Sequence, residues 1–301
     1  MREVAERSER TVGRGLARRL LLASRPVSWI NTAFPFAAAM LLTTGAIDAR
    51  WILGTLFFLV PYNLLMYGIN DVFDYASDAQ NPRKGGVEGA LLPPEAHRAT
   101  LLWSAGLAAP LVFGLLAMGG PASWAVLAVS LFAVVAYSAP GLRWKEVPVL
   151  DSITSSTHFV SPAVYGLVLA GADWSPQLVA ILAAFLCWGM ASHAFGAVQD
   201  VVPDRDAGIG SIATALGARA TVRLAVVLWA AAGALMLLAP WPASLAALVA
   251  VPYIALAAPF WSVADADSAV ANRGWRRFLW VNYACGFLVT LACIAWAMGV
   301  R

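Results

Sequence analysis

Long, nearly uncharged runs of apolar residues dominate the pattern of hydrophobic and polar positions along this 301-residue chain. Most runs are close to the roughly 20 residues that an α-helix needs to cross a hydrocarbon core of about 30 Å. The runs are continuous rather than alternating, which excludes a transmembrane β-barrel. The pattern predicts nine spans, over residues 27–44, 51–69, 99–118, 121–138, 150–170, 178–198, 221–239, 243–262 and 277–298.

Composition supports the same fold class. Hydrophobic residues make up 60% of the chain and charged residues only 12%, against about 25% charged in an ordinary soluble domain. We therefore predict an all-α integral membrane protein, with nine transmembrane helices in one bundle. Residues 1–24 are expected to form a basic amphipathic helix on the membrane surface, and residues 25–301 a single domain.

The distribution of positive charge predicts the orientation in the membrane. The tail 1–25 and the loops near 70–98, 139–149, 199–223 and 263–277 hold 18 of the 20 Lys and Arg residues. Positive charge gathers on the cytoplasmic side of membrane proteins, so the N-terminus is predicted to be cytoplasmic. The net charge of +3 thus reflects topology and a lipid bilayer partner, not nucleic acid.

A cluster of oxygen ligands follows the second predicted span, in the segment NDVFDYASD. If the helix continues, Asp71, Asp74 and Asp78 fall within an arc of about 60°, which Asn70 widens to about 100°. Like charges this close repel unless a cation lies between them. Oxygen ligands without His or Cys suit Mg²⁺, with Mn²⁺ as an alternative. A solvated acidic helix end is the other interpretation of this segment.

A second acidic cluster, Asp200, Asp204 and Asp206, follows the sixth predicted span. The second and sixth spans run in the same direction, so both clusters are predicted on the cytoplasmic side. This arrangement suggests a duplicated four-helix unit, with the two clusters facing each other across a shared cavity. Pro203 interrupts a regular helix here. The expectation that the carboxylates share one face of a helix therefore holds only loosely for the second cluster.

Basic residues lie near the acidic clusters or in loops predicted on the same side. Two Mg²⁺ ions held by carboxylates can bind a diphosphate and stabilise it as a leaving group. Guanidinium groups match phosphate oxygens bidentately, whereas Lys supplies a point charge. The candidate phosphate-binding residues are Arg83, Lys84, Arg143, Lys145 and Arg205. Positive-inside topology is the alternative explanation, and for Arg219 and Arg223 it is preferred.

Three motifs in this order resemble the UbiA superfamily of intramembrane prenyltransferases: N-D-x-x-D-x-x-x-D from Asn70, YSAPGLRWK at 137–145, and D-x-x-x-D from Asp200. The resemblance runs from about residue 25 to the C-terminus. It implies a central cavity where a Mg²⁺-bound prenyl diphosphate ionises to an allylic cation, which an apolar acceptor attacks. It also implies two ions, one bound by Asn70, Asp71, Asp74 and Asp78 and the other by Asp200 and Asp204.

The resemblance assigns roles to the second motif, and physical arguments add three further candidate residues. Tyr137, Arg143 and Lys145 would contact the diphosphate or cap the cavity, whereas Asp206 has no position in the motif. Tyr75 is a candidate aromatic face for the cation. Membranes tolerate polar residues within spans mainly for function, which adds Asn31 and His193; helix-to-helix hydrogen bonding is their alternative role. The catalytic residues would be Asp71, Asp74, Asp200, Asp204 and Tyr137.

The sequence after the first motif, NPRKGGVEGALL, and the segment VQDVVPDRDAGIGSIAT look like those of bacterial and archaeal lycopene elongases. This implies transfer of C5 units from dimethylallyl diphosphate to the ends of lycopene. The expected location is the bacterial cytoplasmic membrane, with the active site facing the cytoplasm. A quinone or aromatic lipid precursor is the alternative acceptor, and an ion-coupled transporter is the alternative class of protein. Any carotenoid cyclase subunit would be a separate chain.

Overall fold

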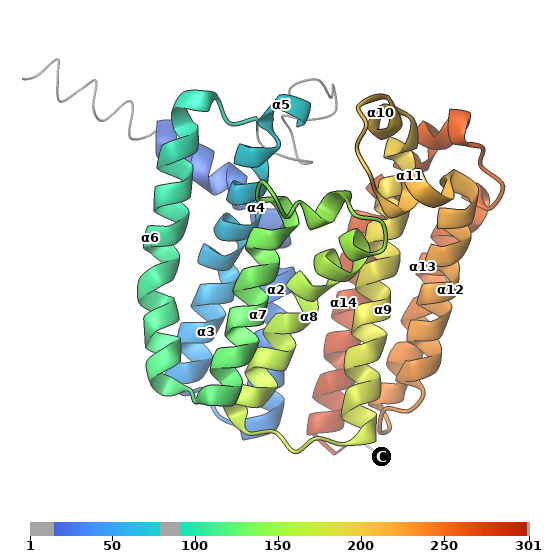
Figure 1. Ribbon diagram of the computed structural model, residues 1–301. Helices are drawn as coiled ribbons and strands as arrows, with labels where there is room; N and C mark the ends of the chain where they lie inside the picture. Colours follow the sequence, from blue (N-terminus) through green and yellow to red (C-terminus); the bar gives the residue numbers. More distant parts are fainter. Residues whose placement is uncertain (1–14, 79–90, 300–301) are drawn as a thin grey trace, which may run out of the picture. The chain divides into compact units, whose positions relative to one another are not determined.

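Helices form all of the regular secondary structure in the part of the chain that the computed structural model describes, residues 15–78 and 91–299 (Figure 1). The chain divides into two compact units. Unit 1 comprises residues 1–143 and 161–171, and unit 2 comprises residues 144–160 and 172–301. Each unit has its own hydrophobic core.

Unit 1 has an aromatic core between its helices. Helix α3 packs against α2, and α4 packs against α6 and α7. The rings of Phe36, Phe58 and Tyr165 lie with their centroids 5.2 to 6.0 Å apart. Inside a bilayer, such helices associate mainly through van der Waals packing. The elements are a helix over 15–23, η1 (Pro26–Ser28), α2 (Trp29–Thr44), α3 (Ala49–Leu59), α4 (Pro61–Phe73), α5 (Tyr75–Asp78), α6 (Pro94–Met118) and α7 (Pro121–Ser138).

The turn between α2 and α3 follows from local sequence. Gly45 ends α2 with a φ of 65°, a left-handed conformation that costs glycine little. Asp48 then caps α3 by accepting the backbone N–H of Trp51 at 2.9 Å. That N–H and the Arg50 guanidinium hold the pKa of Asp48 below its ordinary value. The two helices are therefore joined by a short turn with both ends capped.

The second predicted span is divided in two, because Pro61 separates α3 from α4. Pro61 has no N–H to continue the hydrogen-bond ladder of α3. The buried Asn63 side chain compensates, donating from Nδ2 to the carbonyls of Phe58 (2.9 Å) and Leu59 (3.1 Å). Thr32 on α2 donates to the same Phe58 carbonyl and accepts from Asn63, both at 2.7 Å. Side chains thus satisfy the carbonyls at this break, which lipid could not do.

Unit 2 is organised around α12, which packs against α9 and α13. Its Trp229 is fully buried and stacks on Tyr253, with centroids 5.5 Å apart, while Phe278 lies 5.6 Å from Tyr253. The unit includes the first part of α8 (Leu150–Ala170), whose residues from Ser161 onward belong to unit 1. The other elements are η2 (Trp144–Glu146), α9 (Pro176–Ala197), η3 (Val198–Asp200), α10 (Val201–Asp206), α11 (Ile212–Leu216), α12 (Ala218–Met236), η4 (Ala243–Val249), α13 (Ala250–Ala257), η5 (Ala258–Phe260), η6 (Asp265–Ala271) and α14 (Asn272–Ala297).

Eight helical segments of the described residues are long and apolar enough to cross a membrane, and they correspond to eight of the predicted spans. The remaining predicted span, 150–170, is helix α8. Buried polar residues in its first half, including Asp151, Ser152, Thr154 and His158, make it less apolar than the others. The chain is thus an integral membrane protein, and the crossing by α8 stays a prediction. The eight segments are Gly15–Thr44, Ala49–Phe73, Pro94–Met118, Pro121–Ser138, Pro176–Asp206, Ala218–Met236, Ala243–Phe260 and Asp265–Ala297.

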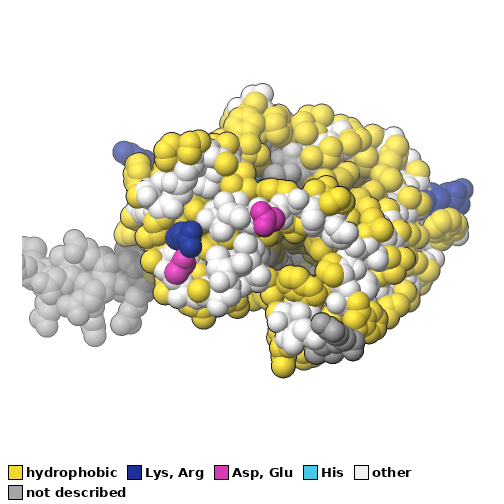
Figure 2. Space-filling model, turned by 90° about the horizontal axis from the view of Figure 1, so that it is seen from below, with side chains coloured by type: hydrophobic (Ala, Val, Ile, Leu, Met, Phe, Trp, Pro, Cys, Tyr) yellow, Lys and Arg dark blue, Asp and Glu magenta, His cyan; other side chains and the backbone are white. Residues whose placement is uncertain are grey.

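Large apolar side chains are exposed on both units. Phe113 on α6 is 69% exposed, and Trp280 and Phe287 on α14 are 75% and 63% exposed. Figure 2 shows one face on which hydrophobic side chains cover most of the visible surface and charged side chains are sparse. Apolar exposure of this extent is unusual for a water-soluble monomer and is what contact with lipid requires.

Substitution of Asn63 by Ala is expected to destabilise the protein by about 1–2 kcal/mol, because it removes the donor to the carbonyls at the Pro61 break. The measurement is the thermal unfolding midpoint of the purified protein in detergent. Thr43→Ala is the matched control, since Thr43 is exposed and bonds only within its own helix, to the Ala39 carbonyl. Equal midpoints for the two variants would contradict this account of the break.

Candidate functional site

The first acidic segment ends α4 and forms α5. Asp74 caps α4, and the N–H of Asp78 donates to the Asp74 carbonyl at 2.8 Å, so the helical path continues across the boundary. Asp71, Asp74 and Asp78 are only 1%, 4% and 8% exposed. Burying carboxylates is costly unless cations or hydrogen-bond donors match them. The partners of these side chains therefore define the site.

Arg25, just before η1, is the partner of Asp71. Its Nη2 donates to Asp71 Oδ1 at 2.9 Å, and its guanidinium carbon lies 4.1 Å from the centre of the Tyr67 ring. The backbone of Arg25 has a φ of 49°, in the left-handed region that non-glycine residues rarely occupy. The ion pair and the contact with the ring hold this conformation. They fix the start of the first predicted span to the end of α4.

Asp74 is bound from two directions. Asn70, one turn earlier on α4, donates from Nδ2 to Asp74 Oδ2 at 2.6 Å and to Ser138 Oγ at 2.9 Å. Arg143, which follows α7, places Nη2 at 3.5 Å from Asp74 Oδ1. Its φ of 41° is also left-handed. The first and second resemblance motifs therefore meet within unit 1, through Asp74 and Arg143.

Other predicted site residues have different surroundings. Tyr75 packs edge-to-face on His97 of α6, with ring centroids 5.2 Å apart. Asn31 and Tyr137 are half-buried on α2 and α7, and Lys145 lies in η2 of unit 2. Two further candidates lie outside the described residues: Arg83 and Lys84.

The second acidic segment is helical but interrupted. Helix α9 ends at Ala197, Asp200 closes the 3₁₀ turn η3, and Asp204 and Asp206 belong to α10. This interruption agrees with the expectation from Pro203, which occupies the first turn of α10, where its missing N–H leaves no gap in the ladder. Asp200 and Asp204 are half-buried and Asp206 is exposed. Whether the two acidic segments share one cavity stays a prediction.

Arg205 is held by hydrogen bonds within unit 2. Its guanidinium donates to the Thr214 carbonyl at 3.1 and 2.8 Å from Nε and Nη2, and to Asp265 Oδ2 at 2.5 Å from Nη1. Asp265 Oδ1 accepts the N–H of Ala218, the first residue of α12, at 2.7 Å. Arg205 thereby fixes α10, the end of α11 and the start of α12 to one another.

Asp151 on α8 is a buried carboxylate that sequence analysis missed. Its Oδ2 accepts the N–H of Ile212 at 2.7 Å and lies 3.4 Å from His193 Nε2, while Oδ1 accepts the N–H of Ser152 at 2.7 Å. His193, on α9, was predicted as a functional polar residue within a span. Asp151 therefore orients His193 and fixes the start of α11, just beyond the second acidic segment.

The acidic segments fit a hard divalent cation by their chemistry. Among the described residues, no three Asp, Glu, His or Cys side chains converge as ligands of a single ion. Mg²⁺ does not require such a cage, because it commonly uses one or two carboxylates together with phosphate oxygens and waters. Asp71 and Asp74 are buried beside the half-buried Asn70 and next to the guanidinium groups of Arg25 and Arg143. They supply carboxylate oxygens for a metal where phosphate could also be bound.

Comparison with known proteins shows which class of protein this chain belongs to. The chain belongs to the UbiA prenyltransferase family, whose sequence pattern matches residues 32–284. It is therefore a prenyltransferase of the membrane-embedded kind, in agreement with the resemblance of the three motifs.

Curated relatives are 50% or more identical to this chain over 92% of its length. The lycopene elongase/hydratase of Corynebacterium glutamicum is 50% identical over 92% of this chain and 97% of that protein. The C(50) beta-cyclic carotenoids biosynthesis protein LbtBC of Dietzia sp. is 55% identical over 92% of this chain, which spans 64% of that longer protein. A UbiA homologue of Archaeoglobus fulgidus, solved with DMAPP and Mg²⁺, shares the fold, with a TM-score of 0.61, 18% identity and coverage of 89% of this chain and 98% of that chain.

Asp151→Ala is expected to loosen α11, because the N–H groups of Ile212 and Ser152 lose their acceptor. Each buried donor left without an acceptor costs about 1–3 kcal/mol. Amide hydrogen exchange at 212–216 in detergent micelles should become faster, and the unfolding midpoint should fall. The exposed Asp173 offers a matched control, Asp173→Ala, in which both values should stay as in the wild type. Unchanged exchange at α11 in Asp151→Ala would refute this role.

Proposed function

We propose that this protein transfers C5 prenyl groups from dimethylallyl diphosphate to the ends of lycopene, giving C45 and C50 carotenoids. The observation that carries the proposal is the 50% identity to a lycopene elongase/hydratase over 97% of that protein's length. The buried acidic group of unit 1 and its guanidinium partners support the proposal, because the carboxylates would hold cations and the guanidinium groups would bind phosphate oxygens.

Two divalent ions are proposed, Mg²⁺ with Mn²⁺ as a substitute. Asn70, Asp71, Asp74 and Asp78 would hold one, and Asp200 and Asp204 the other. When bound, the ions neutralise the diphosphate and stabilise it as a leaving group. The protein's own part is to present carboxylate oxygens in a buried setting that keeps the reaction away from water.

The basic and aromatic residues complete the proposed reaction. Arg143, already within reach of Asp74, would orient the diphosphate while its C–O bond to the allylic carbon breaks and the electron pair leaves with oxygen. A terminal double bond of lycopene then forms the new C–C bond, and the resulting cation loses a proton or adds water. Tyr137 and Tyr75 would face the cation, Asn31 would contact substrate, and His193, oriented by Asp151, would accept the proton. The remaining proposed phosphate-binding residues are Arg83, Lys84, Lys145 and Arg205.

The membrane arrangement is also proposed. The N-terminus and both acidic segments would face the cytoplasm of a bacterial cell, with nine crossings that include α8 and one enzymatic domain over residues 25–301. The basic segment 1–24 would lie on the membrane surface. This arrangement delivers a water-soluble diphosphate from the cytoplasm and an apolar acceptor from the lipid.

Nine crossings place the two termini on opposite sides of the membrane, which reporter fusions can test. Alkaline phosphatase fused after Arg301 should be active, because it folds only outside the cytoplasm, and green fluorescent protein at the same position should stay dark. Both reporters fused before Met1 should give the opposite result. A fluorescent C-terminal fusion would mean an even number of membrane crossings. Helix α8 would then not be one of the membrane-crossing helices.

Expression in a lycopene-accumulating bacterium, followed by pigment extraction and mass spectrometry, tests the reaction. The wild type should yield C45 and C50 species. Asp71→Ala and Asp200→Ala should each lower their amount by at least about 100-fold, because each removes a carboxylate that supports diphosphate departure. Both variants should remain in the membrane fraction. In isolated membranes, a chelator should stop the wild-type reaction and added Mg²⁺ should restore it.

The control variant is Asp267→Ala, which removes an exposed carboxylate of η6 and should leave product levels unchanged. Full activity of both Asp71→Ala and Asp200→Ala would refute the two-ion assignment. Unchanged lycopene with the wild-type protein in the membrane would move the acceptor to a quinone or aromatic lipid precursor.

A further inference from the structure

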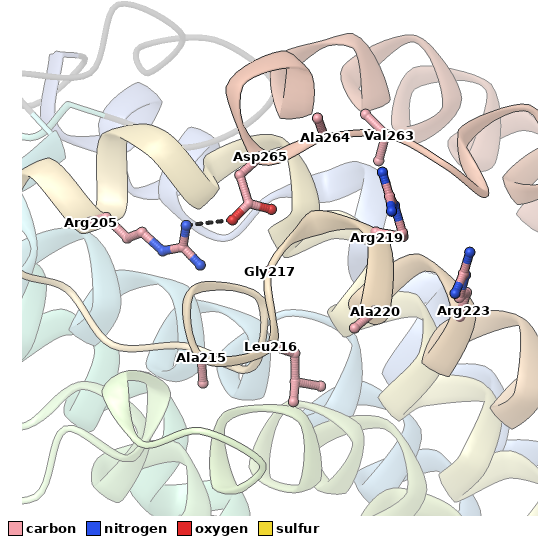
Figure 3. Close-up of a pocket in the computed structure, with 10 residues that line it drawn as sticks. All are labelled: Arg205, Ala215, Leu216, Gly217, Arg219, Ala220, Arg223, Val263, Ala264 and Asp265. Carbon is pink, nitrogen blue, oxygen red and sulfur yellow. Dashed lines mark hydrogen bonds and ion pairs between the residues drawn. The ribbon is translucent and has the colours of Figure 1, made fainter.

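Unit 2 contains a basic cavity at the start of α12, which Arg205 of the second acidic segment also lines. Its volume is about 590 Å³, and its lining includes Arg205, Arg219, Arg223 and Asp265 together with Leu216 and Val263. Figure 3 shows the Arg205 guanidinium on one side of Asp265 and the guanidinium groups of Arg219 and Arg223 on the other. A volume within about 300–1,000 Å³ is typical of sites for small molecules.

The charge in this cavity is not balanced. Both carboxylate oxygens of Asp265 accept hydrogen bonds, one from Arg205 and the other from the N–H of Ala218. Among the described residues, no ion pair joins Arg219 or Arg223 to a carboxylate; Arg219 Nη2 lies 3.5 Å from the Ser262 carbonyl. Three guanidinium groups and one carboxylate therefore leave an excess of two positive charges in one cavity.

The placement of these arginines opposes the stability of the helix that carries them. Arg219 and Arg223 are four residues apart in the first turns of α12, so they lie on one face, where like charges repel. Positive charge at a helix N-terminus is also unfavourable to the helix dipole. A bound anion would reduce both the repulsion between the two arginines and their unfavourable interaction with the helix dipole. Guanidinium groups pair with phosphate oxygens bidentately.

The cavity lies beside the ends of candidate membrane spans. Candidate spans end at Asp206 and Phe260 and begin at Ala218 and Asp265, and residues from all four of these boundaries lie in or beside the cavity. Leu216 and Trp261 are 48% and 44% exposed there, and the Arg223 guanidinium carbon lies 5.1 Å from the centre of the Trp261 ring. Exposed tryptophan beside arginine is typical of the headgroup region of a bilayer.

We infer that this cavity binds the phosphate group of an anionic membrane phospholipid, with Arg219 and Arg223 as its principal ligands. The exposed apolar side chains beside it, Leu216 and Trp261, suit acyl chains rather than free phosphate. Basic pockets between membrane helices are known to take such headgroups. The two principal ligands, Arg219 and Arg223, lie outside the acidic segments and have no role in the proposed reaction, so the inference does not depend on that reaction.

Native mass spectrometry of the full chain in detergent micelles, with phosphatidylglycerol or phosphatidylcholine added, tests the inference. The wild type should retain one phosphatidylglycerol in preference to phosphatidylcholine. One Arg beside an anionic lipid contributes roughly fivefold in affinity, so Arg219→Gln with Arg223→Gln should weaken phosphatidylglycerol binding by about tenfold or more. Replacing the same two residues by Lys should preserve most of the binding, because the charges remain.

The matched control is Arg276→Gln with Arg277→Gln, which removes two exposed charges from α14 of the same unit. It should bind phosphatidylglycerol as the wild type does. An equal loss in the control would mean unspecific attraction to surface charge and would overturn the site. Unchanged binding in the Gln variant would also overturn it. Displacement of the lipid by millimolar inorganic phosphate would make free phosphate the ligand and refute the lipid assignment.

Discussion

Buried charge has to be matched by the protein itself, because burial removes the water that would otherwise solvate it. In unit 1 this constraint ties Asp71 to Arg25 and Asp74 to Arg143. In unit 2 it ties Asp151 to the start of α11. Each of these interactions joins two segments that are far apart in the sequence. The carboxylates that the chemistry needs are therefore also the points that hold the ends of the helices in place.

Backbone strain gathers at these same points. The described residues include three non-glycine residues at positive φ, namely Arg25, Arg143 and Val149. Two of them are the partners of buried aspartates, and Val149 precedes Asp151 by two residues. Left-handed backbone costs a non-glycine residue roughly 1–3 kcal/mol and persists only where the surroundings enforce it. Strain at all three positions indicates that the ion pairs and hydrogen bonds of the buried aspartates decide the path of the adjoining chain.

Sequence alone was sufficient for features that depend on local pattern. Hydrophobic runs locate the helices because span length is a property of consecutive residues, and the spacing of Asp71, Asp74 and Asp78 is visible without a partner. The pairing of Arg25 with Asp71 could not be predicted, since 46 residues separate them and nothing in the spacing links them. Asp151 was missed for the same reason: the partner on Oδ2, the N–H of Ile212, is 61 residues away. Helix α8 shows the limit of hydropathy, because its polar residues are buried within the protein rather than exposed to lipid.

Arginine illustrates why the structure is needed to interpret charge. The positive-inside rule explains Arg25, Arg143, Arg205, Arg219 and Arg223 equally well, because it counts charges without regard to their partners. The structure separates them into two kinds. The first three each approach a carboxylate within 3.5 Å and serve to place helix ends. Arg219 and Arg223 instead form no ion pair among the described residues, and with Arg205 they leave positive charge in excess over Asp265 where a helix begins, which is unfavourable to the fold. Excess positive charge that the fold does not need suggests a bound anion. The phosphate group of an anionic lipid is the anion that we infer for this cavity.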